Sequence, residues 1–273
     1  MAKQMKHQQF QCCYKNWVAQ QQLDLDELLQ TLTNYPTDLD YLQLITKKIV
    51  SHFENYNNSR AELAKHDGPS FLAPSWGSTF ENSFLWIGGC RPALMIRLVY
   101  ALCGSHLNTH LEEFLEGIRH GNIGEISSLQ LKRIDELHAK TIKEEDKLSS
   151  YMATLQEKIA DEPLVLLASG CRGIGESSEG GVVDKTMDTH ALDLYNVLLE
   201  ADKLRMKTLK GILEFLTPLQ AVEFLVAAKK LHLSLHEWST RRDTRMGITQ
   251  LLGSNNPSSS GDPPPPLPPP AET

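Results

Sequence analysis

Two histidines in the last quarter of the sequence have the spacing of a ligand pair. His232 and His236 are four residues apart in a predicted helix, and side chains at positions i and i+4 stand about 5–6 Å apart on one face. Such a pair can hold a compact divalent ion. Alternatively, both rings are half-buried and form hydrogen bonds across the core. Their neighbours Val222, Leu225 and Leu233 are apolar, which suits a large apolar ligand better than a hydrated ion, so no metal site is predicted.

No arrangement of residues is typical of a catalytic site. The sequence has no HExxH, no GxSxG and no cysteine–histidine pair at a recognisable spacing. The glycine-rich segment 169–181 lacks GxxxxGK[ST] and carries glutamates that would repel phosphate, so we interpret it as a flexible loop. The carboxylates of Glu112–Glu113 and Glu144–Asp146 are interpreted as solvated helix faces. The sequence therefore predicts a binding protein, not an enzyme, with no catalytic residues.

Length and charge limit the classes of partner. A chain of 273 residues with 41% hydrophobic content is long enough for one large or two small cores. The net charge of −7 argues against a large phosphate-binding surface, because nucleic-acid affinity depends mainly on positive charge. The arginines of segment 241–245 are expected to complement the dipole of the helix they close. We therefore expect no direct contact with DNA.

The sequence carries no sign of secretion or of a membrane span. No apolar run approaches the roughly 18 residues that cross a bilayer, and residues 1–9 lack the apolar stretch of a signal peptide. The five cysteines form no CxxC pair, which favours buried thiols in a reducing compartment. We expect the protein in the nucleus and cytoplasm.

Apolar residues recur every three to four positions along most of the chain, the period of amphipathic helices. Helices are expected over residues 10–33, 39–65, 107–117, from about 126 to Pro163, 187–216, and 218 to about 238. Within the long helix, residues 141–146 interrupt the apolar seam and are expected to be exposed. Thr217, Pro218 and Gln220 form the clearest start signal, a capping box with proline at the first helical position. The pattern predicts an all-α, bundle-like domain of about six to eight helices over residues 8–250.

The composition changes after Gly253 to asparagine, proline, serine and glycine. Residues 251–273 are therefore predicted to be a disordered tail. Its segment Pro263–Pro270 favours the polyproline II form. This tail is either a solubilising segment or a ligand for an aromatic-lined groove.

The densest apolar run, residues 82–104, has two adjacent glycines at its centre. A helix is expected to end at Trp86–Ile87, turn at Gly88–Gly89 with backbone angles that other residues rarely adopt, and start again near Pro92. The preceding linker, residues 67–77, is expected to pack down through its apolar side chains.

The segment Phe84-Leu85-Trp86-Ile87-Gly88-Gly89-Cys90-Arg91 closely resembles the FLWxGG(F/C)R signature of the plant Delay of Germination domain. That domain also forms the C-terminal half of TGA-type basic leucine zipper factors. Further matches occur in the same order along the chain: Phe10-x-x-x-Tyr14-x-x-Trp17, His52-Phe53-x-x-Tyr56, Ala201-Asp202-Lys203-Leu204-Arg205 and His232-Leu-Ser-Leu-His236-Glu-Trp238.

The resemblance implies a non-enzymatic regulator of seed dormancy and abscisic-acid signalling that docks to other proteins, including type 2C protein phosphatases. The family docks them through the segment Asp-Ser-Tyr-Leu-Glu-Trp, which aligns with residues 12–17 here. Only Tyr14 and Trp17 of that segment are kept, so these two are the partner-binding candidates.

The resemblance also implies haem binding through His232 and His236. Axial ligands approach iron from opposite faces of the porphyrin, whereas these two rings project from one side of a helix. At most one of them is therefore expected to ligate a given iron.

A second reading is a transcription regulator related to the TGA factors. Those factors carry a basic region and leucine heptads ahead of the domain, whereas about nine residues precede the first predicted helix here. The partners would then be transcription-factor complexes, reached without a basic leucine zipper of this chain. A homo-oligomer is compatible with either reading.

Overall fold

The computed structural model describes residues 2–109, 121–161, 165 and 178–248. These residues form eight α-helices, two short 3-10 helices and no β-strand, so the all-α prediction is confirmed for this part of the chain. The α-helices are α1 (Ala2–Asn34), α2 (Leu39–Ala64), α3 (Gly68–Leu72), α4 (Thr79–Ser83), α5 (Ala93–Thr109), α7 (Ser128–Glu157), α8 (Ser178–Phe215) and α9 (Pro218–Arg245). The 3-10 helices are η1 (Ile123–Glu125) and η2 (Lys158–Ala160).

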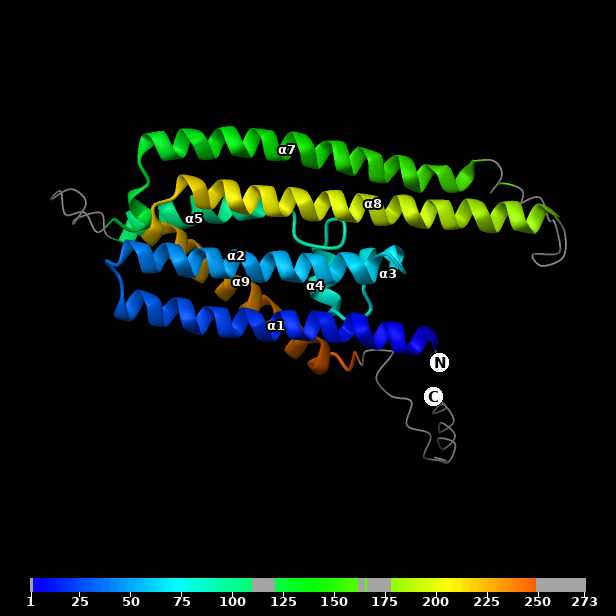
Figure 1. The fold of residues 1–273 in the computed structure, drawn as a ribbon, viewed down its shortest axis with the longest axis horizontal. Coiled ribbons are helices and arrows are strands. Elements are labelled where there is room, and N and C mark those ends of the chain that lie inside the picture. Colours follow the sequence, from blue (N-terminus) through cyan, green and yellow to red (C-terminus); the bar gives the residue numbers. More distant parts are fainter. Residues whose placement is uncertain (1, 110–120, 162–164, 166–177, 249–273) are drawn as a thin grey trace, which may run out of the picture.

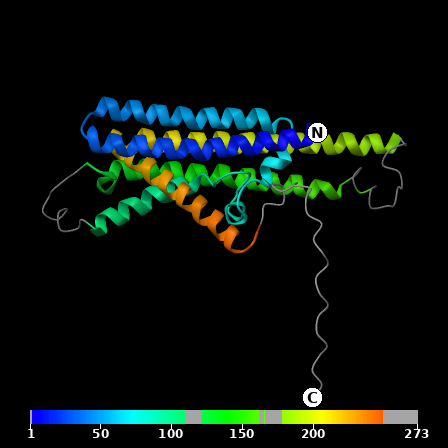
Figure 2. The same cartoon turned by 90° about the horizontal axis from the view of Figure 1, so that it is seen from below.

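Two antiparallel helix pairs lie side by side, α1 with α2 and α7 with α8 (Figure 1). Helix α9 crosses α1 and α2 obliquely and also packs on α5 (Figures 1 and 2). The short helices α3 and α4 pack on α8 and α9, respectively. In both views the N-terminal part of α8 extends beyond the ends of α1 and α2. The molecule is therefore an elongated helix bundle in which α9 packs diagonally across α1 and α2.

Local capping signals define several helix starts. Thr217 accepts a hydrogen bond from the backbone N–H of Gln220, whose side chain accepts one from the N–H of Thr217, and proline is at the first position. Ser78 with Glu81 starts α4 in the same way. Asp38 caps α2 through the N–H of Tyr41. Each cap satisfies backbone donors that the first helical turn leaves free, and the predicted starts of α2 and α9 are confirmed.

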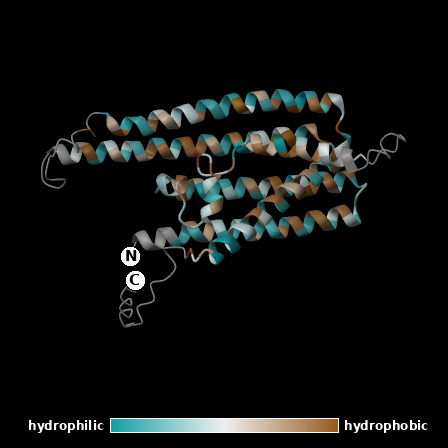
Figure 3. Cartoon of the chain, turned by 180° about the vertical axis from the view of Figure 1, so that it is seen from behind, coloured by the Kyte–Doolittle hydropathy of each residue, from teal (hydrophilic) through white to brown (hydrophobic). Residues whose placement is uncertain are grey.

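The main core lies where the long helices converge. Its fully buried members include Leu28, Leu42, Ile49, Ile96, Ile134 and Phe224. A second cluster of Phe10, Phe71 and Trp76 packs the beginning of α1 on the segment around α3, so residues 67–77 pack down as predicted. Figure 3 shows hydrophobic and hydrophilic residues alternating along the helices, as amphipathic helices require.

The structure corrects the predicted helix–turn–helix around Gly88. Helix α4 ends at Ser83, and Trp86 and Gly89 pair as an isolated antiparallel bridge with backbone hydrogen bonds of 2.8 and 3.2 Å. Between them, Ile87 and Gly88 have φ of 45° and 68°, the positive values that a type I′ turn needs at both central positions. The expected left-handed glycine is present, but no helix ends at Trp86–Ile87. We call residues 86–89 the signature turn.

Other boundaries also differ from the predictions. Helix α1 begins at Ala2 rather than near residue 10, and α8 begins at Ser178, inside the segment interpreted as a loop. Thr141 and Glu145 in the middle of α7 are 2% and 0% exposed, so the predicted exposed interruption is wrong at these positions.

Three predicted segments lie partly or wholly outside the described residues. They are positions 110–117 of the predicted helix 107–117, most of the segment 169–181, and the tail 251–273. The domain limits 8–250 stay a prediction.

Candidate functional site

Two buried arginines from different helices hold the signature turn. Arg60 of α2 donates from Nη2 to the carbonyl oxygen of Gly88 at 2.5 Å. Arg205 of α8 donates to the carbonyl oxygens of Trp86, Ile87 (3.0 Å) and Cys90 (2.7 Å). A tight turn leaves buried carbonyls that need donors, and the planar guanidinium supplies several in a fixed geometry. The turn is thereby fixed to α2 and α8.

A single carboxylate lies between the two guanidinium groups. Asp202 Oδ1 accepts from Nη1 of Arg60 at 3.1 Å and from Nη1 of Arg205 at 2.6 Å. Arg60, Asp202 and Arg205 are only 5%, 6% and 9% exposed. Two cations thus share one anion in a poorly solvated place, and the carbonyl dipoles of the signature turn offset part of the remaining positive charge.

The two glycines of the turn make this close approach possible. A Cβ on Gly88 would lie 2.6 Å from the carbonyl oxygen of Phe71 and 2.7 Å from Nη2 of Arg60. A Cβ on Gly89 would lie 2.8 Å from Cζ of Arg205. Any larger residue would displace the guanidinium groups that satisfy the turn.

Helix α7 closes the other side of the turn through Glu145. Its Oε2 accepts from Nε of Arg91 and its Oε1 from the backbone N–H of Ala93, both at 2.6 Å. Trp86 Nε1 donates to Ser149 Oγ at 2.9 Å. Glu145 is fully buried and serves the first turn of α5, where the free N–H groups favour an anion. The interpretation of this carboxylate as solvated is wrong.

His236 faces a carboxylate and a phenol from two other helices. Its Nδ1 lies 2.8 Å from Oε1 of Glu81, and Tyr14 Oη donates to the same oxygen at 3.0 Å. The rings of Tyr14 and His236 meet edge to face, with centroids 6.0 Å apart. This cluster joins α1, α4 and α9.

The carboxylate of this cluster, Glu81, is ionised at neutral pH. Burial alone would raise the pKa of Glu81, but hydrogen bonds from His236, Ser78 and Tyr14 and the charge of His236 outweigh it and bring the pKa to about 2. The hydrogen bond to Glu81 raises the pKa of His236 against the opposing effect of burial. Protonated His236 and ionised Glu81 therefore stabilise each other.

His232, one turn earlier on α9, has the opposite electrostatic character. It is half-buried, and burial lowers its pKa to about 4 although the charge of Glu81 opposes this. The ring is therefore neutral at physiological pH. Within the described part of the chain, no hydrogen bond to its nitrogens is found.

Trp17 also faces inward, toward α2. Its ring stacks on Tyr56 at 4.3 Å with an interplanar angle of 11° and meets Phe53 edge to face at 4.9 Å. Next to this stack, Lys229 is 1% exposed and donates to Asp24 at 2.7 Å, with Nζ 4.8 Å from the Phe53 ring centroid. Burial lowers the pKa of Lys229, and Asp24 opposes that shift. Trp17 thus belongs to the contact that joins α1, α2 and α9.

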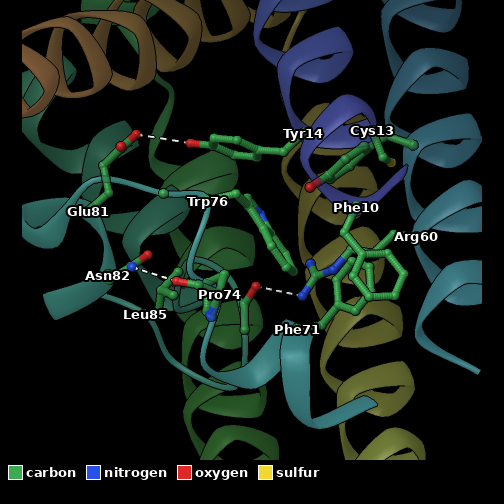
Figure 4. A pocket seen from close by; sticks show the side chains of 13 residues that line it. Phe10, Cys13, Tyr14, Arg60, Phe71, Pro74, Trp76, Glu81, Asn82 and Leu85 are labelled. Atoms are coloured by element: carbon green, nitrogen blue, oxygen red, sulfur yellow. Dashed lines mark hydrogen bonds between the residues drawn. The ribbon is translucent and has the colours of Figure 1, made fainter. Parts of the chain in front are cut away.

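A cavity of about 70 Å³ lies between α1, α2 and the segment around α3 and α4 (Figure 4). Phe10, Phe71 and Trp76 form its apolar side, while Tyr14, Arg60 and Glu81 contribute polar groups. Ligand sites for drug-sized molecules have roughly 300–1,000 Å³. This cavity has room for a few water molecules.

Comparison with known proteins assigns this architecture to a family. The family DOG1, described as seed dormancy control, matches residues 24–101, which include Arg60 and the signature turn. Protein DOG1-like 3 of Arabidopsis thaliana is 38% identical over 248 residues, which cover 87% of this chain and 86% of that protein. The chain belongs to the DOG1 family.

Two further relatives relate this chain to other DOG1-like proteins and to the TGA factors. Protein DOG1-like 1 of Arabidopsis thaliana is 37% identical over 86% of this chain and 90% of that protein. Transcription factor TGA2 of the same plant is 28% identical over 80% of this chain and 59% of its own length. The predicted resemblance to both groups is confirmed.

The cavity of Figure 4 is not a haem site for His232 and His236. The cavity of about 70 Å³ is too small for a porphyrin, and neither His232 nor His236 lines it. His236 is already engaged by Glu81 through Nδ1. Haem binding through this pair stays a prediction that the cavity does not support.

Among the described residues, no group of three or more histidine, cysteine, aspartate or glutamate side chains could hold a metal ion. No helix in the described ranges is long and apolar enough to span a bilayer.

Sequence reasoning missed the charges that organise the site: the buried Arg60, Glu145 and Lys229, and the half-buried Glu81. A usable signal existed for two of them. Arg60 lies on the apolar face of α2, and Lys229 lies one turn before His232 on α9. A charged residue at a core-facing position of an amphipathic helix points to a buried partner, because an unpaired charge there would be too costly.

Proposed function

We propose that this member of the DOG1 family is a non-enzymatic regulatory protein that acts in plants by binding other proteins. The observation that carries the proposal is the match to DOG1-like proteins over nearly the whole length of both chains. The buried arginines, glutamates and lysine described above support it. They lock the helices together and leave the exposed faces of the bundle for partners.

The outer face of α1 is the proposed docking surface. Its exposed residues Gln8, Cys12, Lys15, Asn16 and Ala19 follow helical spacing. Three of them belong to the segment 12–17 that aligns with the docking segment of the family. Partners are expected to contact these outward side chains.

Tyr14 and Trp17 take a positioning role in this proposal. Tyr14 is tied to Glu81, and Trp17 stacks on Tyr56. Both side chains hold α1 on its neighbours, so they fix the orientation of the outer face. Substitution of either residue would weaken the binding of a partner by moving α1.

Type 2C protein phosphatases of abscisic-acid signalling are the proposed partners, and a role in seed dormancy follows from them. Binding of a purified phosphatase is to be measured by calorimetry with the wild type and with the double substitution Lys15→Glu and Asn16→Lys. We expect the double substitution to weaken binding at least about tenfold, because two charges change at the interface.

The control is Lys140→Glu, an exposed position on α7, which should leave the affinity unchanged. Equal binding by all three proteins would rule out the α1 surface. If the wild type binds no phosphatase at all, the phosphatase assignment is wrong, and affinity purification from seed extract identifies the partner instead.

The similarity to TGA2 favours a second candidate, a role inside transcription-factor complexes. The match covers 59% of TGA2 but 80% of this chain. In this alternative the protein acts in the nucleus, and in the first in both nucleus and cytoplasm. Co-purification with transcription factors, without phosphatase, distinguishes them.

A further inference from the structure

Three aromatic side chains outside the signature turn form a partly exposed row. Phe80 and Phe84 come from α4 and its end, and Trp238 comes from α9. The ring of Phe80 lies between the others, with centroids 4.9 Å from Phe84 and 4.6 Å from Trp238. Phe84 is 58% and Trp238 is 44% exposed. We call this row the aromatic ladder.

The rings of the aromatic ladder contact one another, but they are not part of the core. Its rings belong to none of the three buried clusters of the described residues. They meet at angles of 64° and 67°, so the row presents ring faces and edges in alternation. Leu231, two turns before Trp238 on α9, is 59% exposed and extends the apolar surface.

We propose that the segment Pro263–Pro270 of this same chain docks on the aromatic ladder. Seven of its eight residues are proline, and such a run favours the polyproline II helix with three residues per turn. Aromatic rings in alternating orientation are the surfaces on which proline rings bind, and the preformed helix loses little conformational entropy on docking.

The connecting segment has the right length. Helix α9 ends at Arg245, and Gly247 with φ of 66° and the bond from Ile248 N–H to the Asp243 carbonyl close it in a Schellman motif. Ten residues separate Trp238 from Ile248, which corresponds to about 15 Å along a helix. The fourteen residues from 249 to 262 would span about 20 Å root mean square as a flexible chain.

This match of length and span favours docking within one chain. A short flexible linker gives an effective concentration in the millimolar range, highest when its length matches the distance to be spanned. A contact with an intrinsic dissociation constant of about 0.1 mM would therefore be formed most of the time. The same contact between two molecules at micromolar concentration would be rare.

Charge also favours this occupant. Asp262 immediately precedes the proline run. Arg242 has its guanidinium carbon 6.0 Å from the ring centroid of Phe80, and Arg241 and Arg245 lie on the same last turns of α9. Arg241 and Arg242 already face Glu237 at 3.8 Å and Asp243 at 3.5 Å, so Asp262 would approach Arg245 when the prolines cover the rings.

The test is the indole N–H signal of Trp238 in a nitrogen-15 spectrum of the full chain. One variant has all seven prolines of residues 263–270 replaced by serine, which keeps the length. We expect the Trp238 signal to move in this variant, while the signals of Trp17, Trp76 and Trp86 stay in place. Pro257→Ser, outside the run, is the matched control and should move none of them.

A synthetic peptide of residues 260–272 then tests the surface directly. Added to the serine variant, it should return the Trp238 signal toward its wild-type position in a saturable way, and Phe84→Ser should abolish this effect. An unmoved Trp238 signal in the serine variant overturns the proposal. A difference that grows with protein concentration also overturns it, because the occupant would then be a second copy.

Discussion

Gly88 combines a left-handed backbone with close approach to three other groups. Its φ is 68°, and a Cβ there would lie 2.6 to 2.8 Å from Phe71, Arg60 and Leu198. Gly88→Ala is expected to lower the free energy of unfolding by at least about 3 kcal/mol, from backbone strain and overpacking together. Denaturant titration measures this loss of free energy of unfolding.

Gly121 provides a matched control for this substitution. Its φ is also 68°, but nothing lies within 4 Å of a Cβ there. Gly121→Ala should therefore cost only about 1 kcal/mol, the strain alone. Equal losses for the two substitutions would show that the packing around Gly88 contributes nothing.

Asp202 is the anion that allows Arg60 and Arg205 to lie together. Asp202→Asn should lower the free energy of unfolding by about 3 kcal/mol, because two buried guanidinium groups lose their counter-charge. The control is Glu200→Gln, which breaks an exposed pair with Lys203 of 2.6 Å and should cost no more than about 0.5 kcal/mol. Thermal and chemical denaturation of both variants measure these losses. Equal losses would contradict the role of Asp202 as the counter-charge of two buried guanidinium groups.

His232 and His236 should give the stability opposite pH dependences. The pKa of His232 is lowered from its ordinary 6.5 to about 4, so its contribution is full above pH 6.5 and is lost as the pH falls toward 4. The pKa of His236 is raised by Glu81, so its contribution is full below 6.5 and is lost as the pH rises through the raised value.

Denaturant titrations between about pH 4 and 9 test both signs. His232→Gln should remove the loss between about pH 6.5 and 4.5, below which the lowered pKa of Glu81 brings a loss of its own. His236→Gln should remove the loss on the alkaline side. His66 is exposed, and His66→Gln should leave the profile unchanged. Identical profiles for wild type and both site variants would contradict the assigned environments.

At the scale of elements, α7 and α5 depend on one carboxylate. Glu145→Gln keeps the shape of the side chain but places an amide group opposite the donors of Arg91 or Ala93. We expect a loss of about 2 kcal/mol from the unpaired donor. The neighbouring Glu144 is exposed and pairs with Lys147 at the surface, so Glu144→Gln should leave the denaturation midpoint unchanged. A midpoint unaffected by Glu145→Gln would show that α5 does not need this cap.

At the scale of the whole molecule, charge sets the expected behaviour toward DNA. The net charge is −7, and binding to a phosphate backbone needs clustered positive charge. Purified protein should not shift a duplex carrying the TGACG sequence at about 150 mM salt. Tight, salt-sensitive binding in an electrophoretic shift assay would contradict the protein-docking proposal.

The long helices, and the starts of α2 and α9, could be predicted from the sequence by itself. Periodicity of three to four residues is a local property, and so are caps such as Asp38 and the Thr217–Gln220 box. The left-handed Gly88 was also predictable, because only glycine adopts such angles readily. The spaced motifs indicated the DOG1 family for the same reason, since each is a short stretch of sequence.

Only the tertiary structure decided which buried charges meet. Arg60 and Asp202 are 142 residues apart in sequence, and Lys229 and Asp24 are 205 apart. The sequence alone does not show whether a charged residue on a helix faces water or a buried partner. Its environment is fixed by how α2, α8 and α9 cross, and that crossing arises from the packing of whole helix faces. For this reason Glu145 was misread as solvated, and the turn at Trp86–Gly89 was misread as the end of a helix.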